Sequence, residues 1–378
     1  MNIEDFVSGR EVSQYKYKSF SPEKINHEWV ISNPEINSLL AEANRLTGEL
    51  NAYSQIVPDV DFFISMHILK EATTSSRIEG TKTNMEEALV AREDINPEMR
   101  DDWAEVQNYI KAINQSISEL ENLPVSNRLI KMTHKILLSG VRGRHKLPGE
   151  FRKSQNWIGS TLKDAIFIPP HHSEIPELMG DLERFINNEE IQVPHLIRIA
   201  IIHYQFETIH PFLDGNGRLG RLLITLYLVS KSVLKKPSLY LSDFFEKNKA
   251  YYYDNLMVVR VSGNLAQWIR FFLVGVIETS QSSIQVFKDI ISLREEIYSH
   301  KLPQLGSKTP KGQKLIRRLF HNPIIDARQA ASALQISAST ANRLIAQFVD
   351  LGILSELTGY KRNRKYIFKE YFDLFKKR

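Results

Sequence analysis

Apolar residues recur at helical spacing through most of the chain. Residues 61–74 carry apolar positions that suit a helix with one apolar side, namely Phe62, Ile64, Met66, Ile68, Leu69 and Ala72. Similar amphipathic segments cover residues 36–50 and 85–92. Residues 196–209 and the apolar run 222–229 predict two further, largely buried helices. The pattern therefore predicts a mainly α-helical fold.

Two short β-prone runs interrupt this helical pattern, at residues 156–159 and 165–168. A polar stretch lies between them, and Pro169-Pro170 ends the second run. The sequence therefore predicts a small two-stranded hairpin. On its own, this pattern is also that of an ordinary surface hairpin.

The last part of the chain has a pattern of its own. Residues 302–310 read as a linker, and three helical patterns follow at 311–320, 326–334 and 337–351. Residues 352–354 and 359–367 then read as a strand, a basic tip and a second strand. Three helices followed by a β-wing resemble a winged helix-turn-helix domain.

Composition narrows the classes of protein that fit. The 378 residues include no Cys, which excludes a disulfide framework, a thiolate metal site and a Cys nucleophile. The N-terminus does not read as a signal peptide, and no apolar run approaches the roughly 18 residues that span a membrane. We therefore expect a cytoplasmic protein with no membrane partner.

Charge is distributed unevenly along the chain. Residues 301–378 contain 16 Lys plus Arg against 5 Asp plus Glu, a net of +11 within a chain of net charge +5. A basic surface of this kind favours contact with phosphates. Arg343 on the expected recognition helix and Lys361, Arg362, Arg364 and Lys365 on the wing would meet DNA first.

The densest chemistry lies in residues 210–221, HPFLDGNGRLGR. Gly215 and Gly217 allow the backbone to approach an anion closely, and the apolar run that follows places them at a helix N-terminus, where free N–H groups bind phosphate. Arg218 and Arg221 are three apart, so both reach phosphate oxygens from one helical face.

Two further residues of this stretch carry the reacting groups. Asp214 is a hard oxygen ligand suited to Mg²⁺ shared with a polyphosphate. His210, with an ordinary pKa near about 6.5, is a natural proton acceptor for an attacking hydroxyl. Together these residues predict in-line attack on a nucleotide phosphate.

The stretch resembles the Fic (Fido) family signature, His-Pro-Phe-x-Asp/Glu-Gly-Asn-Gly-Arg-x-x-Arg, at every specified position. Most members of that family transfer AMP from ATP to a Ser, Thr or Tyr hydroxyl of a protein and release pyrophosphate. The resemblance implies a helical Fido core that uses ATP and Mg²⁺. It assigns catalysis to His210 as general base with Asp214, Asn216 and Arg218, and nucleotide binding to a run of backbone and side chains: Gly215, Asn216, Gly217, Arg218, Leu219, Gly220 and Arg221.

A second motif lies upstream. Residues 75–80, SSRIEG, match the inhibitory-helix pattern Ser/Thr-x-x-x-Glu-Gly/Asn found in many Fic proteins. Ser75 and Glu79 are four apart and share a helical face, and Gly80 is suited to end the helix, expected at about 61–80. By resemblance, Glu79 pairs with Arg221 and keeps the enzyme weakly active. A related alternative is that Glu79 positions a water molecule so that the same site removes AMP.

The nucleotide base and the protein target are expected at two other places. Residues 249–256 resemble a tyrosine-containing segment that contacts the nucleotide in members of this family, and this resemblance makes Tyr253 the best candidate to stack on adenine, with Tyr252 and Asn255 behind it. Tyrosines packed on a helix with Leu256 and Val259 are the alternative. Residues 148–170 resemble the family's flap, so the predicted hairpin would bind an extended target segment by strand addition.

The sequence predicts four regions along the chain. Residues 1–114 form an N-terminal helical region with the inhibitory helix, 115–285 the Fido core with its hairpin flap, 286–310 a linker and 311–378 the winged helix. The winged helix has two readings, DNA binding and protein interaction, that the sequence leaves equal. Self-modification and a homodimer are further alternatives.

Two functions of different class remain. The first is a self-inhibited protein AMP transferase. The second is a DNA-binding regulator whose Fic core senses nucleotide without turnover. A sensor needs Arg218, Arg221 and the glycines but has no need of a base such as His210, so the sequence favours the enzyme.

Overall fold

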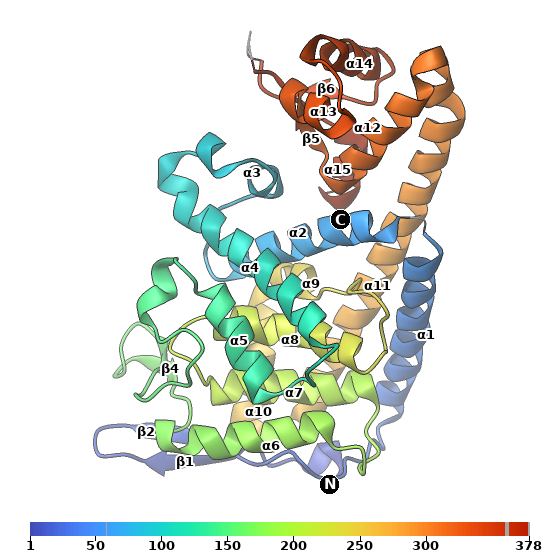
Figure 1. Ribbon diagram of the computed structural model, residues 1–378. Coiled ribbons are helices and arrows are strands. Elements are labelled where there is room, and N and C mark those ends of the chain that lie inside the picture. Colours follow the sequence, from blue (N-terminus) through green and yellow to red (C-terminus); the bar gives the residue numbers. More distant parts are fainter. Residues whose placement is uncertain (58, 360–362, 377–378) are drawn as a thin grey trace.

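The computed structural model describes residues 1–57, 59–359 and 363–376 and confirms a mainly helical fold (Figure 1). The longer helices are α1 (Pro34–Ile56), α2 (Val60–Ile78), α4 (Arg100–Glu119), α5 (Asn127–Leu137), α6 (Ile175–Asn187), α7 (His195–Ile209), α8 (Asn216–Ser230), α10 (Lys249–Ser262), α11 (Leu265–Glu296), α12 (Thr309–His321) and α14 (Ala338–Asp350). Shorter ones are α3 (Met85–Leu89), α9 (Ser242–Lys247), α13 (Ala327–Leu334) and α15 (Lys369–Lys376).

Helix α7 forms the centre of the core. Every residue from Leu196 to Ile209 is buried, the polar His203, Gln205 and Glu207 included, so this helix has no solvent-facing side. Helices α6, α8, α10 and α11 surround it, and α1 lies along α11. The short loop between α7 and α8 therefore starts and ends on elements fixed by the core.

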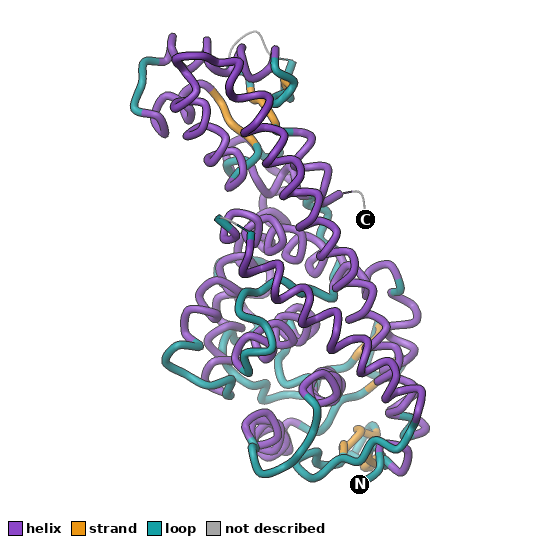
Figure 2. The backbone as a smooth tube through the Cα atoms, turned by 90° about the vertical axis from the view of Figure 1, so that its right-hand side faces the viewer, coloured by secondary structure: helices purple, strands orange, loops and turns teal. Residues whose placement is uncertain are grey.

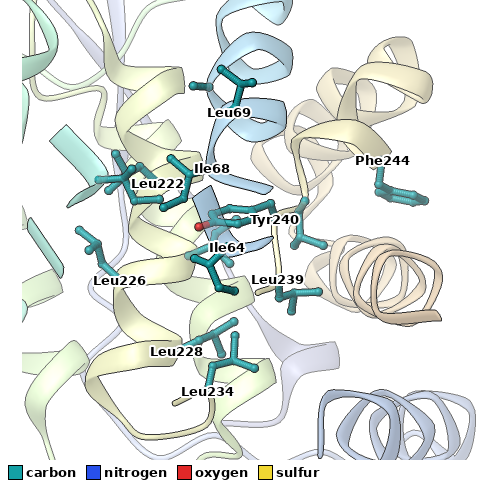
Figure 3. Close-up of a cluster of buried hydrophobic side chains, with 14 of the residues drawn as sticks. Ile64, Ile68, Leu69, Leu222, Leu226, Leu228, Leu234, Leu239, Tyr240 and Phe244 are labelled. Atoms are coloured by element: carbon teal, nitrogen blue, oxygen red, sulfur yellow. The ribbon is translucent and has the colours of Figure 1, made fainter. Parts of the chain in front are cut away.

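Helix α2 packs on α8 through apolar side chains. Ile64, Ile68 and Leu69 of α2 face Leu222 and Leu226 of α8 in one buried cluster, with Tyr240 and Phe244 at its edge (Figure 3). Burial of one such aliphatic side chain contributes about 1.5–3 kcal/mol. The body of α2 is therefore firmly attached to the helix that follows the 210–215 loop.

Two antiparallel hairpins lie at the other end of the core. Strands β1 (Gly9–Ser13) and β2 (Lys18–Pro22) pair with each other, as do β3 (Ile158–Gly159) and β4 (Ala165–Phe167). The second is the hairpin that the sequence predicts. The first hairpin was not predicted from the sequence. It packs against the second, since its Phe20 N–H donates to the carbonyl of Ile168 and the Phe20 and Phe167 rings lie 5.8 Å apart.

The C-terminal part has the expected helices and an extra strand. Helices α12, α13 and α14 fall where the pattern predicts them. The sheet has the antiparallel order β5-β7-β6, formed by Ile324–Asp326, Lys365–Ile367 and Ser355–Glu356. Residues 352–354, expected as a strand, instead lead into β6. The expected wing contacts Lys361 and Arg362 lie outside the described residues.

The expected linker over 286–310 is not an irregular segment. Helix α11 continues to Glu296, and a π turn (Ile297–Lys301) and a 3-10 segment (Leu302–Lys308) lead into α12. The chain changes direction at Gly306, whose φ is 56°. The reason is apolar burial: Leu293, Ile297, Leu302 and Leu305 all face the interior. Figure 2 shows the resulting shape, with α11 reaching from the core to the winged-helix lobe.

The winged helix is packed directly on α2. Phe63 of α2 lies 5.4 Å from the ring of Phe320 and 6.1 Å from that of Tyr371. His67 lies 5.2 Å from Phe375, on the C-terminal helix α15 that the sequence reading did not include. Helix α15 therefore lies beside α2 (Figure 1).

Within the described residues, no helix is both long enough and apolar enough to cross a membrane.

Candidate active site

His210 marks the point where α7 gives way to the loop. Its backbone adopts the left-handed conformation, with φ 49° and ψ 59°, which is rare for a residue with a side chain. The His210 carbonyl accepts hydrogen bonds from Nε of Arg152, at 3.0 Å, and from Nδ2 of Asn156, at 3.2 Å. Both donors come from the flap segment, residues 148–170, so flap and loop are held together.

The loop is closed by an amide side chain. Asn216, the first residue of α8, accepts from the Phe212 N–H at 2.9 Å and donates to the Phe212 carbonyl at 2.9 Å. The Phe212 ring is fully buried and stacks on the imidazole of His134, with centroids 3.8 Å apart. Asn216 thus has a structural role that the motif alone does not reveal.

His134 holds the loop from the other side in a fixed tautomer. Its Nδ1 accepts the Gly149 N–H at 2.8 Å, so that nitrogen carries no proton and Nε2 donates to the Asp214 carbonyl at 2.9 Å. Burial lowers the pKa of His134 to about 4, so the ring is neutral at physiological pH. The position of Asp214 therefore depends on a residue far upstream in sequence.

Two glycines in the first turns of α8 occupy positions where a larger side chain would clash. A methyl group at Gly217 would lie 2.3 Å from Oε1 of Glu79, and one at Gly220 would lie 2.2 Å from Oε1 of Glu207. Gly215, directly before the helix, has φ 77°. The glycines thus bring the helix N-terminus and two carboxylates into close approach, and leave backbone N–H groups for an anion.

Arg218 is buried and paired. Its Nη1 donates to Oε2 of Glu105 on α4 at 3.1 Å, and its Nη2 lies 3.8 Å from Oδ1 of Asp214. Asp214 keeps 43% of its side chain exposed, so its carboxylate is accessible. Magnesium is commonly held by one or two carboxylates together with substrate phosphates. Asp214 fits such a role.

Arg221 is gripped by both residues of the upstream motif. Its Nε donates to Oγ of Ser75 at 2.9 Å, and its Nη2 donates to the Ser75 carbonyl at 2.9 Å and to Oε1 of Glu79 at 2.7 Å. Burial alone would raise the pKa of Glu79, but the charge and hydrogen bond of Arg221 outweigh it, and the pKa is lowered. Glu79 is therefore ionised in this pair.

The C-terminal end of α2 has further anchors. Nζ of Lys249 donates to the Ile78 carbonyl at 2.7 Å, and Arg77 lies 3.2 Å from Glu246. One turn before Ser75, Glu71 accepts from Tyr109 at 2.8 Å and from Ser242 at 2.5 Å. A cation at a helix C-terminus is stabilising because it meets unpaired carbonyls there. Glu79 is thus held near Arg221 by the helix as well as by its own charge.

The surroundings of His210 favour a neutral imidazole. Burial, followed by the charge of Arg260, lowers the pKa of His210 to about 4. Arg260, from α10, donates to the Glu207 carbonyl at 3.0 Å and lies 3.9 Å from the Phe167 ring of the flap. The imidazole is therefore neutral and available as a base at neutral pH, because its pKa lies below the ordinary value of about 6.5.

Tyr253 and Tyr252 have different surroundings. Tyr252 is fully buried, and its hydroxyl is 2.9 Å from Nε2 of His203, so it belongs to the core. Tyr253 is 42% exposed; burial, then the charge of Glu79, raises its pKa to about 12. Asn255 is buried and bonds the Tyr251 carbonyl. Of the three, Tyr253 alone is open to a ligand.

A second carboxyl group lies behind the motif. Glu207 of α7 is buried, and its pKa is raised to about 7 by that burial, against the opposing charge of Arg221. Glu207, Glu105, Arg152, Arg260 and His134 all support the motif, and sequence reasoning assigned none of them this role. Glu207 and Arg152 lie in two segments that the sequence already placed near the motif, the helix before it and the flap. The other contacts join residues far apart in the chain, so no local pattern indicated them.

Two segments of the chain match sequence patterns of one family. Residues 37–118 match the pattern described as Fic/DOC family N-terminal, and residues 124–228 match the Fic/DOC family pattern. The chain is similar to the protein adenylyltransferase Fic of Aedes aegypti, with 28% identity over 190 residues. It is also similar to that of Drosophila erecta, with 40% identity over 82 residues.

The Aedes and Drosophila proteins are both considerably longer than this chain. The matched region covers 50% of this chain and 34% of the Aedes protein, and 21% of this chain and 15% of the Drosophila protein. The chain thus spans about a third or less of the length of the relatives it matches.

Solved structures show the same fold. A Fic family protein from Desulfovibrio desulfuricans G20 superposes with a TM-score of 0.56 and 20% identity, over 89% of this chain and 96% of that one. Fic-1 (residues 134–508) from C. elegans superposes with a TM-score of 0.50 and 21% identity, over 68% and 73%. Sequence patterns and fold agree, and the chain belongs to the Fic/DOC family.

Proposed function

We propose that this protein transfers AMP from ATP to a hydroxyl side chain of a protein and releases pyrophosphate, and that Glu79 inhibits it at rest. The observation that carries the proposal is the grip of Ser75 and Glu79 on Arg221, at the helix N-terminus that follows His210. The relatives named protein adenylyltransferase support the same chemistry.

The site residues suit the binding of ATP and Mg²⁺. The N-terminus of α8 offers N–H groups and a positive dipole, Arg218 and Arg221 offer guanidinium groups, and Asp214 offers an accessible carboxylate. Magnesium would neutralise phosphate charge. Glu79, which pairs with Arg221 through charge, would compete directly with a terminal phosphate for that guanidinium.

The reaction needs one base and a fixed phosphate. His210 accepts the proton of the target hydroxyl, whose oxygen forms a bond to the α-phosphorus while the bond to the bridging oxygen of pyrophosphate breaks. The lowered pKa of His210 keeps its imidazole neutral for this step. Arg218 and the α8 N–H groups stabilise the charge that develops on the phosphate oxygens.

The flap is the proposed place for the target segment. Ile166 of β4 is 70% exposed, and Trp157, directly before β3, is 41% exposed. Arg152, Asn156 and Arg260 join this hairpin to the His210 loop. An extended segment added to the hairpin would therefore be brought to the reacting side chains.

Activation requires only a local change. Because α2 is attached to α8 and to the winged helix by buried side chains, release of the whole helix would expose a large apolar surface. Rotation of the Glu79 side chain, which is 35% exposed, breaks the pair with Arg221 without that loss.

The test compares the wild type with Glu79→Gly and His210→Ala, incubated with Mg²⁺ and ATP labelled at the α-phosphate. Label on protein should be strongest in Glu79→Gly, weak in the wild type and absent in His210→Ala. No label in any variant, with ATP binding retained, would contradict the proposal and favour a nucleotide-sensing regulator without turnover.

The same labelled protein tests removal of AMP. Unlabelled wild type added to purified modified protein should release the label as AMP if Glu79 also positions a water molecule. A stable label would restrict the activity to transfer.

A further inference from the structure

Positively charged side chains border the catalytic loop on the side of α5. Residues 131–153 contain seven Lys plus Arg against one acid, Glu150. Residues 1–300 as a whole are acidic, since the net charge of the chain, +5, is smaller than the +11 of residues 301–378. The basic character is therefore local. We call five of these residues the basic stripe: Lys131 and Lys135 on α5, Arg144 and Lys146 in and after a 3-10 turn (Arg142–His145), and Lys153.

Two close approaches place the basic stripe beside the reacting groups. A methyl group at Gly143, inside the 3-10 turn, would lie 3.0 Å from Oδ2 of Asp214. One at Gly149 would lie 3.1 Å from Cβ of Lys135. Lys131 lies one helical turn before Lys135, on the same face of α5. The stripe thus runs from the Asp214 carboxylate along α5 to the segment that precedes the flap strands.

The charge of the basic stripe is poorly compensated. Four of its five residues are exposed, and Lys131 is partly buried with its Nζ 4.1 Å from the centre of the Phe151 ring. Lys153 pairs with Glu150 at 2.9 Å. In the part of the chain that the structure describes, the other four residues form no ion pair with a carboxylate. Such a single-sign surface attracts a partner of opposite charge.

A groove of about 450 Å³ opens at the flap end of the stripe. Lys131, Lys153 and Glu150 supply charged groups to its lining, and Phe151 and Pro176 supply apolar surface. An Asp or Glu side chain fits this mixture, because its methylene groups can contact the apolar surface while its carboxylate bonds to a lysine. The groove therefore suits an acidic segment of protein.

The outer face of the flap adds apolar groups to the same side of the molecule. Ile158 and Phe167 pair across the hairpin, and Phe167 is buried. Because successive side chains of a strand alternate, Trp157 and Ile166 lie on the opposite face, where they are exposed. Aromatic anchors with a charged rim are typical of protein interfaces.

We propose that the basic stripe selects target proteins in which the modified hydroxyl lies in an acidic segment, rich in Asp and Glu. This inference rests on the proposed function, because it names the class of target that the His210 site receives. A segment that presents its hydroxyl to His210 continues across the stripe, where its carboxylates meet Lys135 and Lys146. The same charge speeds the encounter with acidic targets and disfavours basic ones.

The first experiment measures binding without ATP. Synthetic fluorescein-labelled peptides share one Ser, one Thr and one Tyr and differ in their flanks, which are Asp and Glu, the isosteric Asn and Gln, or Lys. Anisotropy with the full chain should show the acidic peptide binding about tenfold more tightly than the amide peptide, and the lysine peptide most weakly. Added salt should reduce the difference, because exposed charges are screened.

Charge reversal of the stripe is the second arm. Lys135→Glu with Lys146→Glu should weaken binding of the acidic peptide about 5- to 30-fold and leave the amide peptide unchanged. The matched control is Lys311→Glu with Lys314→Glu, at two exposed lysines of α12 that form no ion pair within the described residues. Glu150→Gln removes the one carboxylate beside the stripe and should tighten binding about two- to threefold, a gain that misfolding would not produce.

Transfer from α-labelled ATP in the Glu79→Gly background separates target from nucleotide. The reversal at Lys135 and Lys146 should raise KM for the acidic peptide and leave KM for ATP unchanged. A raised KM for ATP alone would overturn the proposal, because the cations would then serve the nucleotide. Equal binding of the acidic and amide peptides would also overturn it, as would equal losses in the α12 control or tighter binding of single-stranded DNA of the same charge.

This proposal and the proposed function fail separately. Binding of the acidic peptide without any label transfer would contradict AMP transfer and leave the basic stripe as a site for acidic protein segments. Transfer with no preference for acidic flanks would support AMP transfer and overturn the assignment of the target class.

Discussion

Glu79 and Arg221 are joined through a hydrogen bond of 2.7 Å between a carboxylate that is partly exposed and a guanidinium that is almost fully buried. The asymmetry matters because Arg221 cannot move, whereas Glu79 ends its helix and can turn towards solvent. A charge-assisted hydrogen bond contributes about 1.5–3 kcal/mol, and the partial exposure of Glu79 places this pair towards the lower end of that range. Under the proposed function, inhibition would therefore depend on whether Glu79 or a phosphate bonds to this buried arginine.

Ser75 should contribute to inhibition less than Glu79 does. Ser75→Ala removes the Oγ contact with Nε of Arg221 and leaves the backbone contact, a loss of about 1 kcal/mol that corresponds to roughly a fivefold rise in AMP transfer. Initial rates with α-labelled ATP measure this. Ser76→Ala is the control, since Ser76 is buried but its Oγ has no partner among the described residues. Equal effects of the two substitutions would show that helix packing, and not Arg221, is involved.

The activity of Glu79→Gly should be insensitive to mild acid. The pKa of His210 is lowered to about 4, and Glu79 slightly raises it, so its removal moves the pKa no higher. Protonation of the base abolishes transfer; the rate should therefore stay level from pH 8 down to about pH 5 and fall only near pH 4. An unperturbed imidazole would already halve the rate near about pH 6.5. Initial rates with circular dichroism as a folding control distinguish the two.

Glu207 should make stability depend on pH. Its pKa is about 7 in the folded protein, above the ordinary 4.5, so the folded state keeps a proton that the unfolded state has lost. Stability therefore falls as the pH rises from about 4.5 to 7. Glu207→Gln removes this loss, and its advantage over the wild type should be larger at pH 8 than at pH 5 by about 2–3 kcal/mol.

Urea unfolding at the two pH values measures this difference. Glu98→Gln, at an exposed carboxylate, is the control and should shift both values equally. A Glu207→Gln protein with the full pH dependence of the wild type would contradict the assignment.

Tyr253 should affect nucleotide affinity, whereas its neighbour should not. An aromatic ring that stacks on a base contributes about 1–3 kcal/mol, so Tyr253→Ala in the Glu79→Gly background should weaken ATP binding about 5- to 150-fold. Calorimetric titration with ATP and Mg²⁺ measures the affinity. Tyr251→Ala is the matched control, because Tyr251 lies on the same helix and is 67% exposed. A loss in Tyr251→Ala, or none in Tyr253→Ala, would place the base elsewhere.

Local signals predicted much of the fold. Helices α2, α7, α8 and α14, the flap hairpin and the helix end at Gly80 follow from periodicity, apolar runs and turn residues. These features depend on neighbours within a few residues. The strands β1 and β5 gave no such signal, since each is short and defined by a partner elsewhere in the chain.

The support of the site could not be read in the same way. Glu105 is more than a hundred positions from Arg218, and His134 is eighty from Asp214, so their pairing appears only once the chain is folded. The linker was predicted from Pro303, Gly306 and polar neighbours. A proline is tolerated in a first helical turn, and the apolar residues Leu302 and Leu305 decided the conformation instead.

The winged helix touches the chain on both sides of Glu79. Before it, Phe63 packs on Phe320 and Tyr371. After it, Lys376 pairs with Glu86 and Lys365 with Asp94. If a site on the winged helix and the nucleotide site share this one segment, their binding energies are linked, and linkage is reciprocal. A ligand that binds the winged helix and favours the aligned position of ATP must itself bind more tightly when ATP is aligned. Occupancy of either site would then change the affinity of the other.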